Sequence, residues 1–198
     1  MAAASSTKLK SHVSPFCTTG PYFPVEWADA DSDLTRVASA IAQGQRILLA
    51  GSLVEAGGKP TRNSIIELWQ PDAKGIFRHP LDPRAAQADP GFTGWGRART
   101  LADGTFRLRT VMPGAYEENG LTRLPHINVM VLAIGLTRRL VTTLFFEQAP
   151  DPVLDLVPEA RRPKLIAQRD TSLDKDGAHG YRFDILLQGE GETPFFLD

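Results

Sequence analysis

Short runs of β-branched and aromatic residues, each bounded by glycine or proline turns, restrict the fold of this chain more than any other feature. Such residues favour strands, and the turn dipeptides between them favour tight reversals. The runs lie at 46–56, 64–71, 105–113, 126–135, 139–147 and 181–189. Because the chain does not alternate strands with helices, the sequence predicts an all-β fold, an antiparallel β-sandwich with long loops.

The run 105–113 carries the clearest strand periodicity. Phe106, Leu108 and Thr110 alternate with Arg107 and Arg109, which is a period close to two. In a strand this spacing places one set of side chains on each face. The run is therefore predicted to be a strand with one buried face.

One N-terminal helix is predicted between Asp31 and Gly44. Asp31 or Ser32 can cap its start, Gly44 can end it, and apolar residues recur at helical spacing at Leu34, Val37, Ala38 and Ile41. The run 152–165 is expected to hold a short helix interrupted by Pro158 and Pro163, and 71–97 a long loop. Residues 1–27 are predicted to form an extended N-terminal arm at an interface, and 28–198 a single domain.

Composition excludes several classes of protein. The 198 residues, 42% of them apolar, can bury one core, and 22 basic against 23 acidic residues create no strong field for nucleic acid or an anionic membrane. The single cysteine, Cys17, cannot form an internal disulfide, which favours a reducing cytoplasm. No apolar run approaches the roughly 18–20 residues that span a bilayer.

Tyr116 and His126 are the residues most suggestive of chemistry. His126 opens a strongly apolar run, and Tyr116 lies ten residues upstream, just past a Pro-Gly turn. A phenol and an imidazole on neighbouring rims of a sandwich could share a cavity; alternatively, Tyr116 is a half-buried aromatic residue with a hydrogen-bonded hydroxyl. Common nucleotide, serine-hydrolase and zinc-protease motifs do not occur.

An ordered set of segments resembles the intradiol ring-cleaving dioxygenases. These segments are LWQPDAKGIFRH, DPGFTGWGRARTLADGTFRLRTVMPGAY, LPHINVMV and RFDILLQGEGETPFF. The resemblance covers roughly residues 18–198 and is closest to the alpha chains of family members built from alpha and beta chains. It implies a β-sandwich and a hetero-oligomer whose catalytic beta chain holds non-haem Fe(III) with two tyrosines and two histidines.

The four iron-ligand positions implied by the resemblance fall on Phe77, Tyr116, His126 and Asn128. A phenyl ring has no lone pair to donate, and a neutral amide is a poor donor to Fe(III). His79 would offer an imidazole where a phenolate is needed. The expectation is therefore a vestigial metal site that holds no metal, with the Fe(III) cofactor on the partner beta chain.

The resemblance also implies that the arm reaches the partner's active site. The matching residues are Thr18, Gly20, Pro21 and Tyr22, which would wall the substrate cavity of the beta chain; the alternative is a packed arm without substrate contact. Family alpha chains usually carry an arginine where Ile134 stands. Arg138 or Arg139 could compensate from the next turn or strand.

Three hypotheses follow. The first is a subunit without metal, with no catalytic residue of its own, that completes the active site of an iron-bearing beta chain. That partner would cleave protocatechuate, a small aromatic acid, with O2 to 3-carboxy-cis,cis-muconate. The second is a self-sufficient metalloenzyme using Tyr116, His126, His79 and a carboxylate. The third is a non-catalytic β-sandwich with a binding or structural role.

Overall fold

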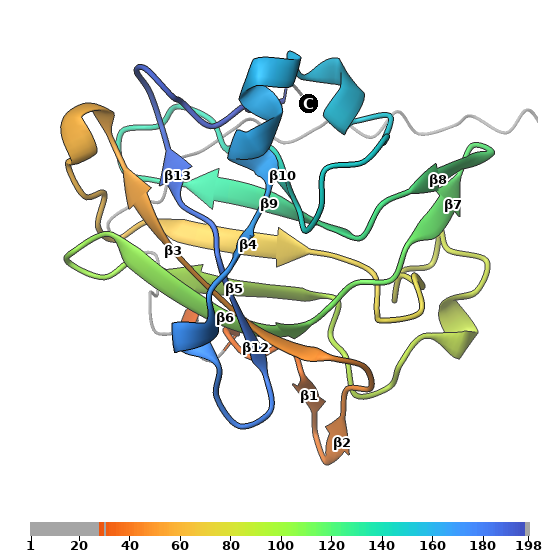
Figure 1. Ribbon diagram of the computed structural model, residues 1–198. Helices are drawn as coiled ribbons and strands as arrows, with labels where there is room; N and C mark the ends of the chain where they lie inside the picture. Colours follow the sequence, from red (N-terminus) through yellow and green to blue (C-terminus); the bar gives the residue numbers. More distant parts are fainter. Residues whose placement is uncertain (1–27, 30, 197–198) are drawn as a thin grey trace, which may run out of the picture.

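Strands dominate the computed structural model, which describes residues 28–29 and 31–196 (Figure 1). The strands are β1 (Arg36–Val37), β2 (Ala40–Ile41), β3 (Arg46–Val54), β4 (Ile65–Trp69), β5 (Trp95–Arg99), β6 (Thr105–Val111), β7 (Tyr116–Glu118), β8 (Leu121–Arg123), β9 (His126–Leu132), β10 (Leu140–Phe145), β11 (Gln168–Arg169), β12 (His179–Arg182) and β13 (Ile185–Leu186). Short 3-10 helices occupy η1 (Ala56–Gly58), η2 (Ala85–Gln87), η3 (Leu154–Leu156), η4 (Glu159–Leu165) and η5 (Thr171–Leu173). The predicted all-β class is confirmed.

Two sheets form the body of the fold. The first has the strand order β10-β9-β4-β5 and is antiparallel throughout. In the second, β3 pairs antiparallel with β6 but parallel with β12 and β13, and β11 pairs with β12. The second sheet is therefore mixed, whereas the sequence analysis expected antiparallel pairing alone.

The core lies between the two sheets. In β6, Phe106 and Leu108 are buried and Arg107 and Arg109 are exposed, as the alternation predicted. Each large apolar side chain removed from water contributes about 1.5–3 kcal/mol to folding. The buried cluster draws on both sheets and includes Ile47, Leu49, Leu53, Ile66, Leu68, Val129, Val131 and Leu144.

The helix predicted between Asp31 and Gly44 is wrong. That segment contains the hairpin β1–β2. Near it, the described residues with helical conformation are Ala28 and Asp29, which precede the predicted helix. Hydrogen bonds to other parts of the chain override the helical spacing: Leu34 N–H donates to the carbonyl of Arg109, and Thr93 N–H donates to the carbonyl of Leu34. Of the four apolar positions on the expected helix face, only Leu34 is buried.

The strand predicted at 181–189 starts earlier, at His179, and is split into β12 and β13. Both parts keep the same parallel register on β3. Between them the Asp184 carboxylate accepts hydrogen bonds from Ser52 N–H and Ser52 Oγ, at 2.8 Å each. A side chain thus replaces a backbone carbonyl in the ladder, which interrupts the strand without shifting it.

Two further segments differ from the sequence-based expectation in detail. The loop predicted at 71–97 ends in β5, which pairs with β4 and extends the antiparallel sheet. The helix predicted at 152–165 exists as the two 3-10 segments η3 and η4. Pro158 precedes η4, and Pro163 lies inside it.

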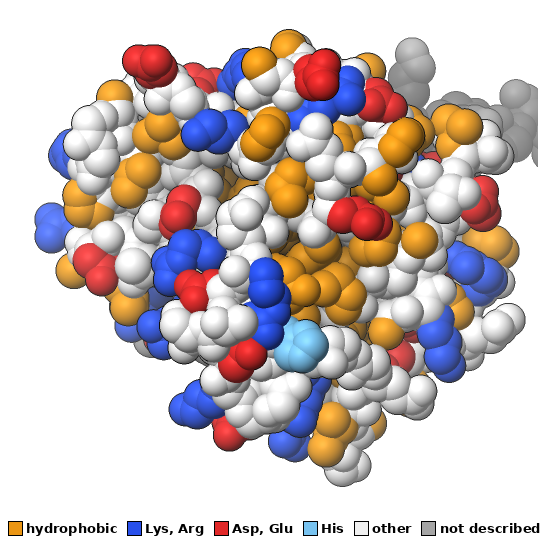
Figure 2. Space-filling view, viewed as in Figure 1, with side chains coloured by type: hydrophobic (Ala, Val, Ile, Leu, Met, Phe, Trp, Pro, Cys, Tyr) orange, Lys and Arg blue, Asp and Glu red, His pale blue; other side chains and the backbone are white. Residues whose placement is uncertain are grey.

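On the face seen in Figure 2, basic and acidic side chains are interspersed and apolar side chains gather near the centre. Among residues 28–29 and 31–196, no helix has the length and hydrophobicity needed to cross a membrane.

Candidate functional site

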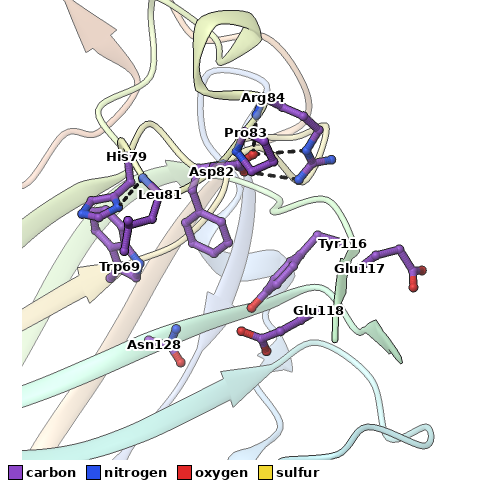
Figure 3. A pocket seen from close by; sticks show the side chains of 11 residues that line it. Trp69, His79, Leu81, Asp82, Pro83, Arg84, Tyr116, Glu117, Glu118 and Asn128 are labelled. Atoms are coloured by element: carbon purple, nitrogen blue, oxygen red, sulfur yellow. Dashed lines mark hydrogen bonds and ion pairs between the residues drawn. The ribbon is translucent and has the colours of Figure 1, made fainter. Parts of the chain in front are cut away.

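A cavity of about 580 Å³ opens where β4 ends, beside β7 and β9 (Figure 3). The end of β4 supplies Trp69, β9 supplies Asn128, and β7 supplies Tyr116 with the two glutamates that follow it. The remaining wall is the loop after β4, which contributes Phe77, His79, Leu81, Asp82, Pro83 and Arg84. Most of the cavity lining therefore comes from the segment that the sequence analysis predicted as a long loop.

The fold brings the four expected ligand positions together. The rings of Phe77 and Tyr116 meet edge to face, with centroids 5.0 Å apart and planes at 86°. Tyr116 Oη lies 3.4 Å from His126 Nε2. Asn128 follows His126 by two residues on β9, so both side chains project from the same face of the sheet. Phe77, Tyr116 and Asn128 therefore line this cavity, while His126 is buried and contacts Tyr116 without lining it.

His126 and Tyr116 satisfy each other's polar atoms. His126 Nδ1 lies 2.6 Å from the carbonyl of Leu124, so this nitrogen carries the proton and Nε2 can accept from the Tyr116 hydroxyl. Burial lowers the pKa of His126, although the Leu124 contact opposes the effect. Burial also raises the pKa of Tyr116 to about 12. At neutral pH the pair is therefore an uncharged phenol and an uncharged imidazole.

The residues of this cavity do not fit Fe(III). The Phe77 ring stacks on Trp69 at 5.8 Å and offers no donor atom. Asn128 Oδ1, the only amide oxygen at the site, accepts a hydrogen bond from Thr143 Oγ1 at 3.1 Å. Of the four expected ligand positions, only Tyr116 and His126 carry suitable donor atoms, and two such ligands are too few for a hard trivalent ion.

His79 does not supply the missing ligand. Its ring lies edge-on to Trp69 with centroids 5.8 Å apart, and Nδ1 accepts from the backbone N–H of Leu81 at 3.2 Å. Within the described ranges, no group of three or more His, Cys, Asp or Glu side chains is placed to hold a metal ion. A metal site built from His79 and a carboxylate therefore has no geometric support.

A buried ionic cluster supports the site from behind. Arg123 Nη1 donates to Glu118 at 2.6 Å and Nε donates to Asp151 at 3.0 Å, while the Arg123 guanidinium lies 5.9 Å from the Tyr116 ring centre. Asp151 also accepts from the backbone N–H groups of Leu124 and Val153. The cluster joins β7, β8 and the 151–154 turn around Tyr116. Asp151 is 28 residues from Arg123, and the three side chains belong to no motif, so sequence reasoning missed the cluster.

Asp82 fixes the loop that carries Phe77. Its carboxylate accepts from Phe77 N–H at 2.9 Å and from the backbone and side chain of Arg84. Burial alone would raise the pKa of Asp82, but these hydrogen bonds hold it below its usual value. Arg84 also donates to the carbonyl of Gly75 at 2.7 Å. Sequence analysis identified the loop but not these two residues.

The predicted interface residues Thr18, Gly20, Pro21 and Tyr22 fall outside the residues that the structure describes. Ile134, in the turn between β9 and β10, is 67% exposed, and Arg138 in the same turn is also exposed. Whether Arg138 or Arg139 takes the place of an arginine at position 134 stays a prediction.

Comparison with known proteins places these features in a family. The family model described as Dioxygenase matches residues 18–189. The chain is 37% identical over 187 residues to the protocatechuate 3,4-dioxygenase beta chain of Burkholderia cepacia, covering 87% of this chain and 80% of the relative. It is also 37% identical over 199 residues to the alpha chain of the enzyme from Pseudomonas putida, covering 92% and 95%.

A solved structure gives the same result. The dioxygenase domain of a dioxygenase–carbohydrate-binding fusion from Streptomyces sp. SirexAA-E aligns with a TM-score of 0.56 and 26% identity, covering 91% of this chain and 98% of that domain. The chain belongs to the intradiol ring-cleaving dioxygenase family. Within that family it is similar to the protocatechuate 3,4-dioxygenase subunits, at equal identity to an alpha and a beta chain.

Proposed function

We propose that this chain is the alpha subunit, without metal, of a protocatechuate 3,4-dioxygenase. It completes the active site of a beta chain that carries Fe(III) and cleaves protocatechuate with O2 to 3-carboxy-cis,cis-muconate. In this proposal residues 28–198 form the sandwich and residues 1–27 the arm, with Thr18, Gly20, Pro21 and Tyr22 at the partner's substrate cavity. Enclosing that cavity would exclude water and strengthen the electrostatic interactions inside it.

The donor set at the vestigial site is the observation that carries the proposal. Phe77 and Asn128 stand where the resemblance places a phenolate and an imidazole, and Tyr116 and His126 are hydrogen-bonded to one another. Ring cleavage by this chain alone would need an iron site that these residues do not provide. A role beside an iron-bearing partner is therefore the better reading.

Sequence identity does not discriminate between the two chain types, because it is 37% both to the Pseudomonas putida alpha chain and to the Burkholderia cepacia beta chain. The alpha assignment therefore rests on the side chains at the vestigial site.

Co-expression tests the proposal. The full chain is produced alone and together with a beta chain that has two tyrosines and two histidines at the corresponding positions. We expect the mixture to co-purify, to consume O2 with protocatechuate and to hold its iron on the beta chain. The chain alone should hold no stoichiometric iron. A coloured, iron-loaded preparation of this chain alone that cleaves the ring would overturn the proposal.

Substituting Tyr116 by Phe separates the hypotheses further. Tyr116→Phe removes one hydrogen bond to His126, a loss of about 1 kcal/mol of stability. The alpha–beta complex should therefore keep its turnover within about twofold, whereas a self-sufficient metalloenzyme would lose an anionic ligand and its activity. Initial rates of O2 uptake, with thermal melts of each variant, measure both effects. Loss of turnover without loss of fold or assembly would favour the metalloenzyme.

A further inference from the structure

Aromatic side chains form a corner in the cavity that lost its metal ligands. Phe77 and Tyr116 meet at 86°, Trp69 lies parallel to Phe77 within 19°, and His79 stands edge-on to Trp69. All four rings border the same space of about 580 Å³. That volume lies in the range of small-molecule sites, and aromatic faces present partial negative charge.

The formal charges around the cavity are also predominantly negative. Its lining includes three carboxylates, Asp82, Glu117 and Glu118, but one guanidinium, Arg84, an excess of two negative charges. Behind it, Arg123 is shared between Asp151 and Glu118, so that these three side chains together keep one negative charge. Glu118, Tyr116 and Asn128 point toward the open space, whereas Glu117 points outward at the rim (Figure 3). An anionic aromatic acid is disfavoured by this field, and a cation is favoured.

The lining also selects the kind of cation. A primary ammonium is compact and strongly hydrated, and an aromatic wall replaces few of its water hydrogen bonds. An alkylated ammonium is weakly hydrated and gains attraction from ring faces within about 6 Å. We propose that this cavity binds a small organic cation through an alkylated ammonium group, held by Trp69, Phe77 and Tyr116. This role goes beyond the proposed subunit function and does not require a beta chain.

Calorimetric titration of the full chain with choline tests the proposal. The neutral isostere 3,3-dimethyl-1-butanol has the same shape without the charge, and benzoate reverses the charge. A cation–π contribution of about 1 kcal/mol corresponds to roughly fivefold in affinity, so choline should bind about fivefold more tightly than the isostere. Equal binding of the two, tighter binding of benzoate, or no binding of choline would each overturn the proposal.

Two tryptophans on paired strands provide a matched control. Trp69 lines the cavity, and Trp95 lies opposite it in the β4–β5 register, outside the lining and 5.1 Å from the Arg97 guanidinium. Trp69→Leu should weaken choline binding at least about fivefold, and Trp95→Leu should leave it unchanged. If Trp69→Leu fails to fold, Phe77→Leu takes its place. Equal effects of the cavity and control substitutions would show that choline binds elsewhere.

Discussion

Replacing Phe77 by Tyr and Asn128 by His together should produce a chain that binds Fe(III) much more tightly than the wild type. The double variant presents two phenols and two imidazoles at positions that the fold already brings together, three of them lining one cavity and the fourth, His126, in contact with Tyr116. Loss of a residue that merely supports a ligand lowers metal affinity 10–100-fold, so restoring two direct ligands should raise it by more than about 10³-fold. Such a gain would show that the side chains at positions 77 and 128, rather than the shape of the cavity, limit iron binding by this chain.

Iron content per chain and the visible absorption of tyrosinate bound to ferric ion measure this gain. The single variants Phe77→Tyr and Asn128→His are the controls, and each should bind more weakly than the double variant. Because burial raises the pKa of Tyr116 to about 12, iron binding must remove a proton that this phenol holds more tightly than usual. Iron affinity of the double variant should accordingly rise with pH. A folded double variant that stays colourless would contradict the vestigial-site interpretation.

Substituting Asp151 by Ala should destabilise the fold by about 3–5 kcal/mol, because it removes the buried partner of the Arg123 guanidinium and leaves it only the half-exposed carboxylate of Glu118. The Asp151 side chain is fully buried and that of Arg123 is 8% exposed. The substitution also removes the acceptor for Leu124 N–H and Val153 N–H. Chemical denaturation of both proteins measures the difference.

Asp155→Ala is the matched control, four residues away. Asp155 pairs with Arg162 at the surface, where an ion pair contributes less than about 1 kcal/mol. A change for Asp151→Ala as small as that of the control would show that the buried cluster is not structurally important.

Asp151→Ala should also make the free energy of unfolding depend less on pH in acid. Burial alone would raise the pKa of Asp151, but hydrogen bonds from Arg123, Leu124 and Val153 hold it below its usual value. A lowered folded-state pKa stabilises the protein above the unfolded value of about 3.9, and this contribution is lost as pH falls. Wild type should therefore lose more stability than Asp151→Ala below about pH 4. Denaturation midpoints between pH 3 and 6 check the sign.

Local patterns predicted the strands because side-chain alternation and turn residues act within a few positions. The runs that became β3, β4, β6, β9 and β10 were all located from such patterns. The helix prediction for 31–44 is wrong because the backbone of Leu34 forms hydrogen bonds with Thr93 and Arg109, which lie far along the chain, and these override the helical spacing. Strand β5 was missed for a related reason, since its residues are strand-forming only when paired with β4.

The sequence by itself determined which side chains stand at the four positions that the resemblance assigns to iron ligands: a phenyl ring at 77, an amide at 128, one phenol and one imidazole. These four positions therefore cannot form a Tyr₂His₂ iron site. Only the tertiary structure decided that three of these positions, 77, 116 and 128, line one cavity, and that the Tyr116 hydroxyl faces the buried His126. It also decided that Arg123 and Asp151 form a buried ion pair. Chemical identity belongs to each residue alone, whereas proximity between distant residues arises from packing of the whole chain.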